Sequence, residues 1–144
     1  MYLNRSTSLE HSSIDGMPIK YLIQKLRKDG PEKFNNPSTA EFELHVEGVD
    51  RPFWVHKDFL ISQSEFFNEN LTAVRPGDLV KIVLPSPETF ESILEYLYTG
   101  DDDKWYDTIT PDNYQDICNN IDFLGLGSEI RNICIAYYQN NGNA

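Results

Sequence analysis

The chain has 144 residues, 40% of them hydrophobic and 12% aromatic, which is enough apolar material for one globular domain with its own core. Twelve Lys and Arg against 23 Asp and Glu give a net charge of −11. Residues 39–144 hold six basic and nineteen acidic residues, hence −13, whereas residues 1–38 hold six and four, hence +2. Such an acidic body repels phosphate groups, which argues against direct nucleic-acid binding and against docking to a membrane.

The cysteines and the termini indicate an intracellular protein, in the cytoplasm or the nucleus. Cys118 and Cys134 lie in helical patterns and form no Cys-x-x-Cys pair, as expected of reduced thiols. The N-terminus lacks the apolar segment of a signal peptide, and no run reaches the roughly 18 apolar residues of a membrane span. Composition predicts a disordered polar tail at 1–14, a single domain at 15–140 and a polar tail at 141–144.

Residues 19–28 have the apolar spacing of an amphipathic helix. The apolar positions follow i, i+3, i+4, i+7 and are Ile19, Leu22, Ile23 and Leu26. Pro18 suits the first turn of this helix, and Gly30 followed by Pro31 ends it. Because the apolar stripe covers one face only, the helix must pack against another surface.

A hairpin, a helix and a third strand follow. The alternation in "EFELHVEG" places Phe42, Leu44 and Val46 on one side, which predicts a half-buried strand, and "PFWVH" predicts its hairpin partner. The segment "KDFLISQSEFFNENL" has helical spacing, and "LVKIVLP" predicts the third strand.

Three helices are predicted for the rest of the chain. The segments "SPETFESILEYLYTG" and "TPDNYQDICNNIDFLGLG" each begin with a capping residue and a proline, and "SEIRNICIAYYQNN" continues the apolar spacing. Between the first two, "DDDKWYD" is predicted to be an acidic loop. Three short strands among these helices predict an α+β domain, a small three-stranded sheet covered by a helical cluster.

No group of residues has the spacing of a catalytic, cofactor or metal site. His56 is predicted to be structural, at the end of a strand, because no other His or Cys lies at the spacing of a zinc site. The acidic run lacks the alternation and the glycine of a calcium loop, and the chain has no phosphate-binding glycine motif and no nucleophile elbow. We therefore expect no enzyme and no cofactor.

The combination of four segments resembles the BTB/POZ domain family. In chain order they are "EFELHVEG", "FWVHKDFLISQSEFF", "VKIVLPSPETFESILEYLYTG" and "NYQDICNNIDFLGLGSEIRNICIAYY", and the resemblance spans roughly residues 19–138. The second segment is similar to the family's signature passage from strand to helix, with His56 followed by Lys57. The resemblance implies a BTB/POZ-like fold and an interaction module rather than a catalyst.

The resemblance also implies a homodimer formed through the helix that precedes the first strand. The dimer interface is then expected at Ile19, Leu22, Ile23 and Leu26, with parts of the 57–67 helix. The family often pairs an aspartate at the start of the first strand with the basic residue after the histidine. Glu41 and Lys57 would form this charged pocket here, with a carboxylate one methylene longer, which alters the shape of a corepressor pocket.

Family members that recruit a cullin often carry an apolar-x-Glu motif after the signature helix. Arg75 and Gly77 occupy those positions here, so the motif is missing and cullin recruitment is weakened. A partner surface on this side is expected to involve Asn70, Leu71, Arg75 and Tyr98.

Three functions fit these observations. The first is a homodimerising protein–protein interaction module that acts as an adaptor or scaffold. The second is a substrate adaptor of a cullin–RING ubiquitin ligase, and the third is the dimerisation domain of a transcriptional regulator that binds DNA through another domain. Fold alone does not choose among them.

Overall fold

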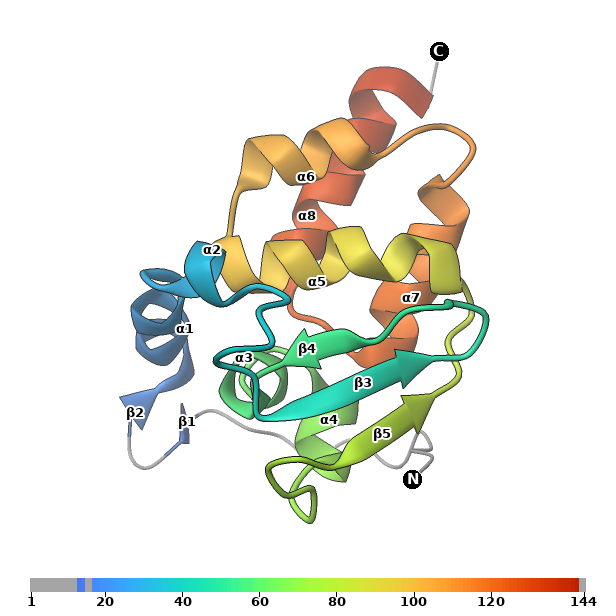
Figure 1. Ribbon diagram of the computed structural model, residues 1–144. Coiled ribbons are helices and arrows are strands. Elements are labelled where there is room, and N and C mark those ends of the chain that lie inside the picture. The colour runs from blue at the N-terminus through green and yellow to red at the C-terminus, as the bar shows by residue number, and fades with distance from the viewer. Residues whose placement is uncertain (1–12, 15–16, 143–144) are drawn as a thin grey trace.

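The computed structural model describes residues 13–14 and 17–142 and has the expected mixture of short strands and helices (Figure 1). In chain order the elements are β1 (Ser13–Ile14), β2 (Met17–Pro18), α1 (Ile19–Arg27), α2 (Gly30–Lys33), β3 (Phe42–Val46), β4 (Phe53–Val55), α3 (Lys57–Ile61), α4 (Glu65–Asn70), β5 (Leu79–Ile82), the 3-10 turn η1 (Pro87–Thr89), α5 (Phe90–Thr99), α6 (Asp102–Thr108), α7 (Tyr114–Leu124), α8 (Ser128–Tyr137) and the π-helical turn η2 (Tyr138–Gly142).

The main sheet has three strands in the order β4-β3-β5. The predicted hairpin is present, since β3 pairs antiparallel with β4, and β5 pairs parallel with β3 on the other side. Alternation decides which face is buried: Phe42, Leu44 and Val46 point into the core, and Glu43 and His45 point outward. In Figure 1, α3 and α4 lie behind the sheet, and α6, α7 and α8 are grouped beyond α5. The predicted α+β fold, a small sheet with a helical cluster, is therefore confirmed.

The helix predicted after His56 is interrupted. Helix α3 ends at Ile61, and α4 begins after Ser64, whose backbone is extended. The Ser64 hydroxyl accepts a hydrogen bond from the Phe67 backbone N–H at 3.2 Å and donates one to the Leu124 carbonyl at 2.7 Å. These two hydrogen bonds stabilise an extended residue at Ser64, so the chain forms two short helices although the apolar spacing predicts one continuous helix.

The prediction of an acidic loop at "DDDKWYD" is wrong, because this segment forms α6. Asp101 caps the helix by accepting a hydrogen bond from the Lys104 backbone N–H at 3.1 Å. Asp102 and Asp103 lie in the first turn, where the positive end of the helix dipole favours carboxylates. Trp105 is buried and ties the helix to the core. The acidic run Asp101–Asp103 therefore forms the N-terminal end of a helix and not a solvated loop.

The first elements lie at one side of the molecule. The predicted helix at 19–28 is confirmed as α1, and β1 pairs antiparallel with β2 just before it. Residues 1–12 of the predicted N-terminal tail and residues 143–144 of the C-terminal tail lie outside the described residues. Within the part of the chain that the structure describes, no helix is long and apolar enough to cross a membrane.

Helix α2 contacts α5 backbone to backbone at Gly30. A Cβ atom at Gly30 would stand 1.7 Å from the Tyr98 carbonyl oxygen, so only a glycine fits there. Gly127, by contrast, has nothing within 4 Å of such an atom.

We therefore expect Gly30→Ala to lower the free energy of unfolding by about 3 kcal/mol, because two backbone segments must move apart. Gly127→Ala is the matched control and should change it by no more than about 0.5 kcal/mol. Urea denaturation of both variants measures the difference. Equal stability of the two variants would show that α2 does not pack on Tyr98 as described.

Candidate interaction site

Helix α1 presents an apolar stripe that its own chain covers only in part. None of its residues is buried, and all four predicted interface residues are partly exposed. Leu26 packs against the hydrophobic core of its own chain. Leu26 therefore also holds α1 to its own body, and its place in the dimer face stays a prediction. Ile19 and Ile23 line an open cleft, and Leu22 does not.

Arg27 fastens the end of α1 to three other elements. Its Nη2 donates to Gln63 Oε1 at 2.8 Å, and its Nη1 donates to Glu129 Oε1 at 3.0 Å. The guanidinium also lies 5.1 Å from the ring centre of Tyr96, close enough for a cation–π contact. The sequence pattern alone did not mark Arg27 as a contact residue. The one available signal was its position four residues after Ile23, on the apolar side of the helix.

The cleft beside α1 has a volume of about 590 Å³. One wall is α1, and the other wall comes from the turn between α3 and α4 and from residues 125–130 before and within α8. Ile19, Ile23, Leu97, Leu126 and Ile130 supply its apolar lining. A half-exposed apolar stripe next to a largely apolar cleft offers a surface on which apolar side chains of a partner could be buried.

His56 is buried and fixed by Tyr98. The Tyr98 hydroxyl accepts a hydrogen bond from the His56 backbone N–H at 2.8 Å and lies 2.9 Å from His56 Nδ1. On the other side of the ring, His56 Nε2 lies 2.8 Å from the Thr39 hydroxyl. These partners are satisfied together when Tyr98 donates its proton to Nδ1 and the imidazole carries its own proton on Nε2.

The surroundings of His56 keep the imidazole neutral. Burial lowers the pKa of His56 below its usual value; the carboxylate of Glu41 opposes this shift, and the ammonium of Lys33 adds to it. Both ring nitrogens are occupied by Tyr98 and Thr39, so neither is available to a substrate or a metal. His56 therefore acts as a joint between β4, α3 and α5.

Glu41 and Lys57 are neighbours, but not as the ion pair expected for the charged pocket. Glu41 Oε1 accepts a hydrogen bond at 2.8 Å from the backbone N–H of Lys57, the first residue of α3. The Lys57 ammonium instead donates to the Val74 carbonyl at 2.6 Å. A carboxylate at a helix N-terminus is stabilised by the dipole and by the free N–H groups.

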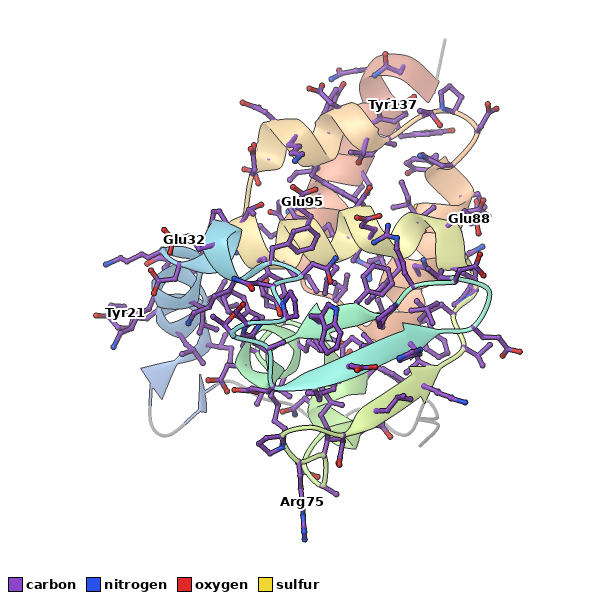
Figure 2. All side chains as sticks on the ribbon, viewed as in Figure 1. Tyr21, Glu32, Arg75, Glu88, Glu95 and Tyr137 are labelled. Atoms are coloured by element: carbon purple, nitrogen blue, oxygen red, sulfur yellow. The ribbon has the colours of Figure 1, made fainter. Side chains whose placement is uncertain are left out.

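The predicted partner surface needs a correction at two of its four positions. Leu71 and Tyr98 are fully buried, Leu71 in the core after α4 and Tyr98 against His56. They cannot contact a partner on the surface. Asn70 is half-buried, and its side chain donates to the Phe66 carbonyl at 2.7 Å. Arg75 is exposed, and Figure 2 shows it pointing away from the body.

The two cysteine thiols are held in their protonated form. Burial raises the pKa of Cys134 to about 12 and also raises that of Cys118, so both thiols stay protonated at neutral pH. Among the described residues, no three His, Cys, Asp or Glu side chains come together as metal ligands.

Comparison with known proteins identifies the family. A sequence profile of the BTB/POZ domain matches residues 32–141, which is 110 of the 144 residues. The chain belongs to the BTB/POZ domain family. The BTB domain of zebrafish PATZ1 superposes with a TM-score of 0.62 over 90% of this chain and 100% of that chain, at 19% identity, which supports the shared fold. No curated protein sequence matches the chain.

The BTB/POZ family is one of protein–protein interaction and dimerisation modules. The predicted resemblance and fold are therefore confirmed. The matched range begins at residue 32, after α1, so the family match does not cover the helix that carries the apolar stripe.

The lowered pKa of His56 predicts how the stability of this BTB domain depends on pH. Unfolded His56 binds a proton near its usual pKa of about 6.5, whereas folded His56 binds one only at lower pH. Between these two pKa values the unfolded state binds more protons than the folded state. The free energy of unfolding therefore falls as the pH drops below about 6.5, by at most about 1.4 kcal/mol per pH unit.

His56→Gln should remove this part of the pH dependence, because an amide does not titrate, while keeping a contact where Nε2 was. The wild-type protein is the reference, and its stability should fall more steeply with decreasing pH than that of His56→Gln. Urea denaturation between pH 7.5 and the lower limit of folding compares the two. An unchanged slope in His56→Gln would show that His56 is not the buried neutral group described above.

Proposed function

We propose that this BTB domain is a homodimerising interaction module that serves as an adaptor or scaffold. The observation that carries the proposal is the half-exposed apolar stripe on α1, with Ile19 and Ile23 facing an open cleft. Apolar side chains left partly in water favour association, and a second copy of the chain supplies the same stripe. The membership of a family of dimerisation modules supports this proposal.

The anchoring of α1 to its own body favours a dimer with defined geometry. The helix is fixed by Leu26, which packs against the core, and by the contacts of Arg27 with Gln63, Tyr96 and Glu129. The stripe is therefore presented in one orientation. A two-fold interface buries the same residues twice. Because α1 is already held in one position, it loses little conformational entropy when the dimer forms.

More specific roles rest on partners beyond the dimer. For a substrate adaptor of a cullin–RING ligase, the exposed Arg75 in place of an apolar anchor weakens the case, since a few buried anchors supply most interface energy. The dimerisation domain of a transcriptional regulator is compatible with an acidic module that avoids DNA itself. Affinity purification from native extract separates these roles, because a cullin or a corepressor would be recovered with the domain.

Light scattering at micromolar concentration should give about 33 kDa, twice the 16.6 kDa chain mass. Ile23→Asp should return the mass to that of one chain with unchanged helicity, because an unpaired carboxylate in an apolar interface costs several kcal/mol and a two-fold interface suffers it twice. Ile19→Asp provides a second variant with the same expected result.

Tyr21→Asp is the matched control for charge and helix position. Tyr21 is 58% exposed, and Figure 2 shows it pointing away from the body, so its variant should remain dimeric. A wild-type mass of one chain at every concentration would refute the dimer. Loss of the dimer in Tyr21→Asp but not in Ile23→Asp would move the interface to the other face of α1.

A further inference from the structure

Four tyrosine rings form a continuous chain at the end of the helical cluster. Ring centres of Tyr106 and Tyr137 are 5.7 Å apart, those of Tyr137 and Tyr114 are 6.1 Å apart, and those of Tyr114 and Tyr138 are 5.6 Å apart. The rings come from α6, α7, the end of α8 and the start of η2, and we call them the tyrosine chain. In Figure 1 this end lies away from the sheet and from α1, and Figure 2 labels Tyr137 there.

The tyrosine chain leaves part of its aromatic surface in water. Tyr138 is 45% exposed, and Ile135, three residues earlier on the outer side of α8, is also 45% exposed. Tyr106 and Tyr114 are half-buried, and the Tyr106 hydroxyl is held by the side-chain amides of Asn140 and Asn141, which donate to it at 3.2 and 3.0 Å. Tyr137 is buried between these rings, so the aromatic surface that reaches solvent belongs to Tyr138 and, in part, to Tyr106 and Tyr114.

The segment that carries the four rings is mostly acidic. Residues 101–142 hold eight Asp and Glu and two basic residues, Lys104 and Arg131. Both cations are engaged: Lys104 pairs with Glu95, and Arg131 pairs with Asp122 at 2.6 Å. Exposed carboxylates flank the aromatic surface along the chain, Asp103 and Asp107 on α6 next to Tyr106, and Asp112 before Tyr114.

We infer that the tyrosine chain and its flanking carboxylates bind a basic segment of a partner protein, with Arg or Lys side chains laid over the rings. A guanidinium stacks on a tyrosine face and donates to a nearby carboxylate at the same time. A purely apolar partner would have to desolvate the carboxylates without compensation, and an acidic partner would be repelled. The surface is separate from the α1 stripe, so dimerisation and this binding are independent.

The test uses a fluorescein-labelled short peptide of alternating Arg and Gly, with alternating Glu and Gly as the negative control. Fluorescence anisotropy at about 0.15 M salt, where surface charges are screened beyond about 8 Å, measures binding to the full chain. Tyr138→Ala and Asp107→Asn should each weaken binding of the Arg peptide roughly fivefold or more, because each removes one half of the recognition.

Matched controls separate this site from the general acidity of the chain. Tyr21→Ala removes an exposed tyrosine elsewhere, and Asp50→Asn removes an exposed carboxylate elsewhere, and both should leave the affinity unchanged. Ile23→Asp should also bind the peptide as the wild type does, whatever its effect on the dimer. Equal weakening by Asp50→Asn and Asp107→Asn, or no saturation up to roughly 1 mM protein, would overturn the inference. Thermal melts of Tyr138→Ala confirm that a loss of binding is not a loss of fold.

Discussion

The fold depends most on the side chain of Tyr98, which joins four elements at one buried point. Its ring stacks on Phe59 of α3 at 4.1 Å between ring centres, and Phe34 meets its edge at 5.7 Å. Its hydroxyl holds both the backbone and the ring of His56, and its own carbonyl is where Gly30 of α2 approaches. Burial raises the pKa of Tyr98 well above its usual value, so the hydroxyl keeps the proton that it donates. Each hydrogen bond contributes about 1 kcal/mol and the aromatic stack about as much again.

Around this joint, the polar side chains of the strand-to-helix passage are bonded within the chain itself. His56 uses both ring nitrogens inside the protein, and Glu41 and Lys57 serve helix and loop backbone rather than a shared pocket. With the strand-to-helix passage fixed in this way, α2 and α5 are set in place, and α1 is fastened to them through Leu26 and Arg27. The two proposed interaction surfaces are parts that this frame leaves partly exposed: the stripe and cleft at α1, and the tyrosine chain at the opposite end.

Local patterns in the sequence were enough to predict the strands, most helices and the family. Alternation gave the buried face of β3, and the passage around His56 gave the family resemblance, because both depend on neighbouring residues. The missed features depend on contacts between distant residues. Ser64 ends one helix because its hydroxyl meets Leu124, and Trp105 holds α6 in a helix by entering the core. Leu71 and Tyr98 were predicted to lie on a partner surface, but tertiary packing buries both side chains. The contacts of Arg27 with Gln63, Tyr96 and Glu129 likewise join residues far apart in the sequence.

The most direct test of the joint is a double-mutant cycle of His56→Gln and Tyr98→Phe, followed by urea denaturation at pH 7.5. Gln keeps a polar atom near the Nε2 position but loses the contact of Nδ1, and Phe keeps the stack on Phe59 but loses the hydroxyl. The account predicts that the two changes are coupled by about 1 kcal/mol or more, with the double variant less destabilised than the sum of the single variants. Additive effects, with a coupling within about 0.3 kcal/mol of zero, would contradict it, because His56 and Tyr98 would then stabilise the fold independently.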